Sequence, residues 1–168
     1  MIRQLLLVCV LLLTINSGRA ASLVARAEAT ELRTSGGSIL SRVERDDQGN
    51  ITSLRLNDMQ LSQEDFEELG RLDHLRRLVL YRSKFSGRDV AGLERCKSLE
   101  HLNLTSTEVT DDVIDAILKL KKLRTLCLGD VNITPNAVER LKDLNRERDK
   151  IGSEHLRWGY SQRSNDRK

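Results

Sequence analysis

The chain has 168 residues, one proline and a formal net charge of +3. Its 28 basic and 25 acidic side chains nearly balance, and the positive surplus lies at the two ends, so we expect no broad basic face for nucleic acid. The sequence has no His, Cys and Asp spacing typical of a metal site, and no glycine-rich phosphate loop or nucleophile motif. We therefore expect no metal, no cofactor and no enzymatic activity.

The first twenty residues have the order of a secretory signal. Arg3 precedes an apolar run from Leu5 to Ile15, and small residues follow as far as Ala20. This order predicts a signal peptide over residues 1–20, cleaved near Ala20 or Ala21. An uncleaved anchor is the alternative, although the run is short for a membrane span. We expect a secreted or periplasmic protein with no membrane span after cleavage.

Residues 21–50 do not continue the pattern that follows them. They predict a short helix over residues 22–32 and then a hairpin over residues 38–56, with Ile39 and Val43 on its first strand and a turn at Asp46–Gly49. The end of a stacked array must shield its open core. We therefore expect residues 21–50 to form an N-terminal helix and hairpin cap.

Residues 51–144 carry one pattern four times at a constant interval. Each unit has two leucines separated by one residue, which places both on one face of a short strand. An apolar position follows, and then a hydroxyl residue suited to begin a helix. Apolar residues spaced by three come next, which favours a tight, short helix. The strand leucines are Leu54 and Leu56, Leu78 and Leu80, Leu102 and Leu104, and Leu126 and Leu128; the expected helix caps are Ser62, Ser86, Thr110 and Thr134.

The pattern L-x-x-L-x-L-x-x-[small]-x-[VIL]-[ST] resembles the leucine-rich repeat family, above all the compact secreted bacterial members with a Val/Ile-Thr-Asp turn. The third unit, which begins at Cys96, is the best copy. The resemblance implies an α/β solenoid of four strand–turn–short-helix units with a parallel sheet on one face, and it implies binding to a partner. The asparagine ladder of longer extracellular repeats is absent, because its position holds Met59, Ser83, Thr107 and Val131.

Residues 145–168 form a charged C-terminal segment, in which the next pair of strand leucines would fall at Lys150 and Gly152. The repeat therefore stops after four units. The segment has two interpretations: a solvated, disordered tail, or a C-terminal cap. In the second, the last unit is covered by the apolar residues Ile151, Leu156, Trp158 and Tyr160.

The outward residues of the predicted strands are the candidate partner-binding site. Strand alternation places Arg55, Arg77, Val79, Tyr81, His101 and Asn103 on one open surface. Arginine and tyrosine are frequent at binding hot spots, and two guanidiniums favour an acidic epitope on a protein partner. The alternative is that this surface is merely solvated. We expect the protein to be a monomer.

The cysteines complete the sequence-based expectations. Cys96 falls at a core position and Cys127 faces outward, so we expect no disulfide between them.

The leading hypothesis for the function is an exported, non-enzymatic protein-interaction module. A structural or assembly role through the solenoid end or the tail is the alternative. A hydrolase built on Cys127 and His101 is remote, because their strand positions are offset by two residues.

Overall fold

The computed structural model describes residues 22–33, 41–86, 89–152 and 154–162. The predicted signal peptide over residues 1–20 and Ile39 of the predicted hairpin lie outside the described residues. Within the described segments, no helix is both long enough and apolar enough to cross a membrane.

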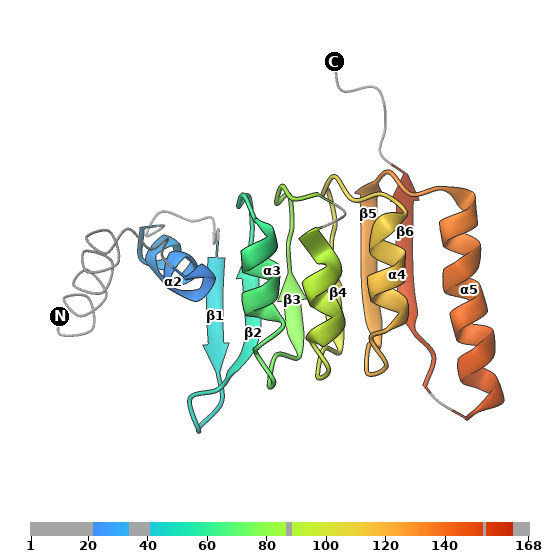
Figure 1. The fold of residues 1–168 in the computed structure, drawn as a ribbon, viewed down its shortest axis with the longest axis horizontal. Helices are drawn as coiled ribbons and strands as arrows, with labels where there is room; N and C mark the ends of the chain where they lie inside the picture. The colour runs from blue at the N-terminus through green and yellow to red at the C-terminus, as the bar shows by residue number, and fades with distance from the viewer. Residues whose placement is uncertain (1–21, 34–40, 87–88, 153, 163–168) are drawn as a thin grey trace, which may run out of the picture.

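One six-stranded sheet organises the fold, with its strands in chain order (Figure 1). β1 (Ser41–Arg45) pairs antiparallel with β2 (Ile51–Leu56), forming the predicted hairpin. All later pairs are parallel. The parallel strands after β2 are β3 (Arg77–Val79), β4 (His101–Asn103), β5 (Thr125–Val131) and β6 (Arg157–Gln162). The fold is therefore α/β with a mostly parallel sheet.

The register between β2 and β5 joins residues that hold the same position in successive units. Leu54 pairs with Leu78, Leu78 with Leu102, and Leu102 with Leu126. Because side chains alternate along a strand, this register places the strand leucines in two columns on one face. All eight predicted strand leucines are at most 1% exposed. They form the side of the hydrophobic core that lies against the sheet.

Helices cover the leucine face of the sheet, with α3 and α4 in front of it in Figure 1. In chain order the helices are α2 (Leu23–Arg33), α3 (Gln63–Leu69), the 3-10 helix η1 (Asp89–Arg95), α4 (Asp112–Leu118) and α5 (Pro135–Lys150). The three-residue spacing predicted a tight, short helix in each unit, and η1 is such a 3-10 helix. α3 and α4 are short α-helices, whereas α5 is an α-helix of 16 residues, so the prediction is wrong for the fourth unit. α3 and η1 pack backbone to backbone, since a side chain at Gly92 would lie 2.3 Å from the Phe66 carbonyl oxygen.

Two of the four predicted helix caps directly precede a helix in the structure. Ser62 precedes α3, and its N–H donates to the Asp65 carboxylate at 2.8 Å. Thr134 precedes α5, and its hydroxyl accepts from the Ala137 N–H. The Ser86 N–H donates in the same way to Asp89, the first residue of η1. The fourth prediction, Thr110, is wrong, because the residue before α4 is Asp111.

Asp111 already has a helical backbone, with φ of −55° and ψ of −23°, and its carboxylate makes no capping bond to α4. The carboxylate accepts from both the N–H and the hydroxyl of Thr134, at 2.8 and 2.6 Å. The Asp111 side chain therefore links the start of α4 to the start of α5, and holds two successive units in register.

A left-handed residue follows each of the strands β2, β3 and β4, and a fourth lies near the end of β5. The φ angles of Asp58, Arg82, Ser106 and Asp130 lie between 54° and 57°. The N–H of each of the first three donates to a carbonyl of the next unit, as in the 2.8 Å bond from Ser106 to Gly129. The unusual conformation therefore extends the contact between units beyond the short strands, at a cost in backbone strain for residues other than glycine.

Ser83 follows β3, at the position that Met59, Thr107 and Val131 hold in the other units. Its hydroxyl is buried, donates to the Leu56 carbonyl at 2.5 Å and accepts from the Met59 N–H at 3.1 Å. Thr107, one unit later, donates only to the Leu104 carbonyl of its own unit. Within the described residues, the Ser83 hydroxyl thus links its unit to the preceding one.

The N-terminal end of the sheet is closed by α2 together with β1. Both oxygens of Glu68 accept from the first N–H groups of α2, those of Leu23 and Val24, at 2.9 and 3.3 Å. Arg26 of α2 pairs with Asp65 at 2.7 Å, and Ser41 of β1 donates to the Ala27 carbonyl. Leu23 and Ala27 are fully buried, so α2 completes the core at this end.

The C-terminal segment, for which the sequence left a disordered tail and a cap as alternatives, is ordered as far as the structure describes it. The boundary expected after residue 144 falls inside α5, and β6 adds a parallel strand to β5. Leu126 pairs with Trp158, so the connection from β5 to β6 is longer than the connections between the earlier parallel strands. The interpretation of residues 145–168 as a disordered tail is therefore wrong for the part that the structure describes.

The apolar residues of this segment divide in their burial. Leu156 is 2% exposed, and Trp158 and Tyr160 pack against the core. Ile151 is 76% exposed in the turn after α5, so its predicted place in the cap is wrong. The buried guanidinium of Arg148 lies at this end of the core, where it donates to the carbonyls of Leu123 and Leu120 at 2.6 and 3.3 Å.

Candidate partner-binding face

The face of the sheet opposite the helices presents two rows of side chains. The strand pairing aligns each row across all six strands. The first row contains Glu44, Ser53, Arg77, His101, Thr125 and Arg157. The second row contains Arg42, Arg55, Val79, Asn103, Cys127 and Gly159. We call this surface the outer face.

Five of the six predicted site residues belong to these rows, and the sixth, Tyr81, follows β3. Arg55, Arg77 and Tyr81 are exposed, whereas Val79, His101 and Asn103 are half-buried. Tyr81 is one of two large apolar or aromatic side chains exposed among the described residues, at 38%. The side-chain oxygen of Asn103 already accepts a hydrogen bond from the Thr105 N–H at 2.9 Å, which within the described part of the chain leaves its amide N–H groups for a partner.

The charges on the outer face are unevenly paired. Arg42 contacts Glu44 at 3.2 Å, and Arg124, just before β5, contacts Glu154 at 3.1 Å. The guanidiniums of Arg55 and Arg77 have no carboxylate within ion-pair distance among the described residues. These two positive charges are available to a partner.

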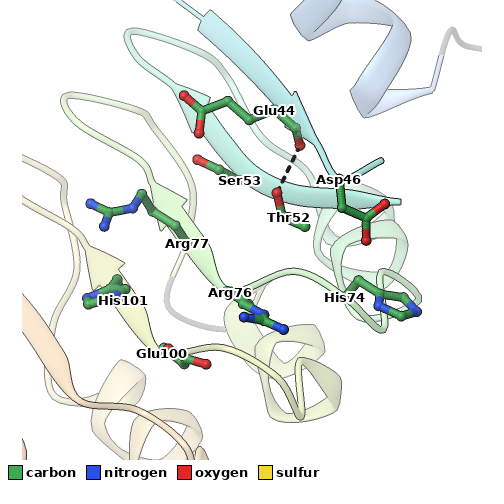
Figure 2. Close-up of a pocket in the computed structure, with 9 residues that line it drawn as sticks. All are labelled: Glu44, Asp46, Thr52, Ser53, His74, Arg76, Arg77, Glu100 and His101. Carbon is green, nitrogen blue, oxygen red and sulfur yellow. Dashed lines mark hydrogen bonds between the residues drawn. The ribbon is translucent and has the colours of Figure 1, made fainter. Parts of the chain in front are cut away.

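A hollow of about 400 Å³ lies over the beginnings of β2, β3 and β4 (Figure 2). Figure 2 shows Arg77 and His101 on neighbouring strands at one side of it, and Arg76 and Glu100 just before those strands. The hollow is lined by Glu44, Asp46, Thr52, Ser53, His74, Arg76, Arg77, Glu100 and His101. Its three carboxylates and two guanidiniums nearly balance, so its lining does not select one sign of ligand.

A second hollow of about 270 Å³ lies over β1, β2 and β3. It is lined by Arg42, Glu44, Ser53, Arg55, Arg77 and Val79. Arg42 and Glu44 come from β1 and were not among the predicted site residues. The alternation of the predicted hairpin strand around Val43 is the sequence signal that could have placed them on the outer face.

His101 has a lowered pKa. Burial disfavours its charged form most, and the neighbouring Arg77 adds repulsion. The imidazole is therefore neutral at pH 7, and it offers the outer face a hydrogen-bonding group rather than a charge. The positive character of this surface comes from the arginines alone.

The relation between Cys127 and His101 agrees with the offset expected from the sequence. Cys127 pairs with Asn103, whereas His101 pairs with Thr125. The two side chains are thus diagonal on neighbouring strands, and no hydrogen bond joins them among the described residues. Nor does the described part of the chain contain a group of three or more His, Cys, Asp or Glu that could hold a metal ion. That the protein is not an enzyme stays a prediction.

Cys96 and Cys127, the two cysteines among the described residues, lie on opposite sides of the sheet and are not bonded to each other. Cys96 is 2% exposed, and its thiol contacts the Leu69 carbonyl at 3.4 Å. Burial raises the pKa of the Cys96 thiol to about 12. Cys127 is half-buried on the outer face. Cys96 therefore acts as a small core residue and not as a nucleophile.

Comparison with known proteins leaves the family open. No family model matches the chain. The chain is similar to the crystal structure of PEPR1–AtPEP1, with a TM-score of 0.41 and 19% sequence identity over 68% of this chain. The match spans 19% of that longer chain. The case for a function therefore rests on the residues of this chain.

Proposed function

We propose that the chain is an exported, non-enzymatic leucine-rich repeat protein that binds a protein partner through its outer face. The observation that carries the proposal is the grouping of Arg55, Arg77 and Tyr81, which are exposed together on neighbouring elements. Neither guanidinium has an ion-pair partner among the described residues. Arginine and tyrosine supply much of the binding energy at protein interfaces.

The strand backbone supports this role. Arg55 and Arg77 stand on neighbouring, paired strands, so their backbones lose little freedom when a partner binds. A guanidinium grips a carboxylate through two parallel hydrogen bonds, which favours an acidic epitope. The central strands β3 and β4 have three residues each, so the face is small and suits a modest, transient interface with a monomeric protein.

Affinity capture of the natural partner tests the proposal. Arg77→Ala and Tyr81→Ala should each weaken capture by about 1–3 kcal/mol while the circular dichroism spectrum and thermal midpoint stay unchanged. Arg71→Ala is the matched control, because Arg71 is an exposed arginine outside both hollows. Glu67→Ala and Lys119→Ala probe the helix side and should have no effect. Loss of capture in the helix-side variants, with Arg77→Ala and Tyr81→Ala silent, would exclude the outer face.

Export is proposed from the order of charged, apolar and small residues over residues 1–20. N-terminal sequencing of the mature protein should begin near Ala21 or Ser22. Recovery of an intact Met1 in a membrane fraction would mean that the segment is an anchor.

Assembly through the C-terminal end is the second candidate, because β6 is the last strand of the sheet and has a neighbour on one side only among the described residues. An unpaired strand edge can accept a further strand. Sedimentation at increasing concentration tests this role: a mass that rises with concentration supports assembly, and a constant monomer mass excludes self-assembly through this edge.

A further inference from the structure

The hollow over β1, β2 and β3 brings three guanidiniums together from three successive strands. Arg42 comes from β1, Arg55 from β2 and Arg77 from β3. Glu44 is the one carboxylate in the lining, so the lining has a net charge of +2. In Figure 2, Glu44, Ser53 and Arg77 occupy three neighbouring strands in that order.

The strand pairing makes this arrangement unfavourable for the folded protein alone. Arg42 lies directly opposite Arg55 in the antiparallel pair. Like charges in directly opposed positions destabilise a sheet. Glu44 contacts Arg42 at 3.2 Å but neither of the other two arginines. The repulsion between Arg55 and its neighbours is therefore only partly compensated within the described residues.

The lining also offers an unused hydroxyl. Ser53 is half-buried between Glu44 and Arg77 in its row, and its side chain makes no hydrogen bond among the described residues. A hydroxyl donor beside guanidinium forks matches a ligand with several acceptor oxygens on one atom. It adds little to the recognition of a single carboxylate, whose two oxygens one arginine already satisfies.

We propose that this hollow binds a phosphate monoester on a side chain of the partner protein. A phosphorylated side chain carries a charge of about −1.5 to −2 at pH 7 and three acceptor oxygens, whereas a carboxylate carries −1 and two oxygens. The phosphate thus neutralises the +2 lining, and a carboxylate leaves it positive. Arg55 and Arg77 hold the phosphate directly, and Arg42 shares its charge with Glu44. This inference rests on the proposed function and names the chemistry of its anchor point.

Calorimetric titration of the full chain with short blocked peptides tests the proposal. The probes are Gly-phosphoserine-Gly, its unphosphorylated form, Gly-Asp-Gly and Asp-Gly-Asp, together with inorganic phosphate. The phosphopeptide should bind at least about tenfold more tightly than each of the others, which corresponds to about 1.4 kcal/mol. Equal binding of Asp-Gly-Asp would overturn the proposal, because the hollow would then read net charge and not the phosphate group. Equal binding of inorganic phosphate would exclude a peptide-borne ester as the ligand.

Variants that remove a positive or a negative charge from the lining should change phosphopeptide binding in opposite directions, which makes the test specific to the hollow. Arg55→Gln and Arg77→Gln should each weaken phosphopeptide binding about tenfold or more. Glu44→Gln should strengthen it, because the change removes a repulsive charge and releases Arg42. Arg71→Gln, the matched control outside the hollow, should leave it unchanged. Equal losses in Arg71→Gln and Arg55→Gln, or weaker binding in Glu44→Gln, would contradict the assignment.

The proposed function and this inference fail separately. If no phosphopeptide binds but capture of the natural partner still requires Arg77 and Tyr81, the outer face binds an unmodified epitope and only the phosphate site is wrong. If the phosphopeptide binds and capture is independent of the outer face, the hollow is an anion site and the proposed function is wrong.

Discussion

One residue in each of the turns after β2, β3 and β4 has a left-handed backbone, which costs conformational free energy. Ser106 has φ of 57°, and its side chain makes no hydrogen bond among the described residues. Left-handed backbone costs an ordinary L-residue roughly 1–2 kcal/mol, and asparagine is better suited to it. The strain persists because the Ser106 N–H is fixed by the Gly129 carbonyl of the next unit.

We expect Ser106→Asn to raise the free energy of unfolding by about 0.5–1 kcal/mol, a fraction of that strain. Urea denaturation measures the change. Ser62→Asn is the control, because Ser62 has φ of −106° and begins a helix, where asparagine and serine are equivalent. A gain in Ser62→Asn as large as that in Ser106→Asn would show that backbone strain is not the cause.

The buried thiol of Cys96 should make stability depend on alkaline pH. Its pKa is about 12 in the folded protein against an ordinary value of 9.0. Between these values the unfolded chain loses the proton first, so stability is fully present below pH 9 and falls as the pH rises toward 12. The slope from this group approaches about 1.4 kcal/mol per pH unit. Denaturation across this pH range should show that part of the slope vanish in Cys96→Ala and persist in Cys127→Ala.

At the scale of the element, Arg148 ties α5 to the segment between α4 and β5. Its guanidinium donates to the carbonyls of Leu123 and Leu120, which lie between α4 and β5. Burial lowers its pKa, yet an arginine stays charged at any physiological pH. Replacing it removes the donor to the buried Leu123 carbonyl, whereas the Leu120 carbonyl still accepts from the Leu123 N–H.

Arg148→Met should therefore lower the free energy of unfolding by about 1.5–3 kcal/mol. Arg146→Met, on the same helix, removes an exposed guanidinium paired with Asp143 and Glu139, and should cost less than about 1 kcal/mol. Chemical denaturation measures the free energy of unfolding of both variants. Equal decreases in the two variants would mean that the buried Arg148 contacts do not stabilise this end of the core.

The helix α2 depends on a carboxylate from α3. Glu68 accepts from the first two N–H groups of α2, where a helix favours negative charge. Glu68→Ala should accelerate hydrogen exchange in α2 about tenfold, the equivalent of about 1.4 kcal/mol of local stability, with β3 and β4 unaffected. Glu67→Ala, which lacks these contacts, is the control. Unchanged exchange in Glu68→Ala would show that α2 is held by Leu23 and Ala27 alone.

At the scale of the whole molecule, the two ends of the sheet are closed by different devices. α2 and β1 cover one end, and α5 with β6 covers the other (Figure 1). A stacked array exposes its core wherever the last unit is uncovered. The short parallel strands in the middle therefore depend on the ends for their stability.

Truncation after Lys150 should destabilise or unfold the whole chain, because it removes Leu156, Trp158 and Tyr160 from the core. Truncation after Gln162 keeps β6 and is the matched control, which should retain the thermal midpoint of the full chain. Scanning calorimetry compares the two. A cooperative transition at an unchanged midpoint after truncation at Lys150 would show that β6 is dispensable.

Local patterns in the sequence determined the strand register, the buried leucine columns, the hairpin and the helix starts at Ser62 and Thr134. Each of these depends on residues within one unit or on the constant interval between units, so alternation and capping chemistry are sufficient to predict them. The outward position of Arg55 and Arg77 follows from the same alternation. The positions of Cys96 in the core and Cys127 on the outer face follow from the same pattern.

The tertiary structure alone decided the features that join distant segments without a periodic signal. β6 pairs with β5 after α5, which is longer than the other described helices, and no repeat of the leucine pattern marks it. The buried role of Arg148 and the bond between Asp111 and Thr134 depend on which neighbour lies opposite in space. Arg42 faces Arg55 only because the hairpin has this register, and that pairing creates the positive hollow.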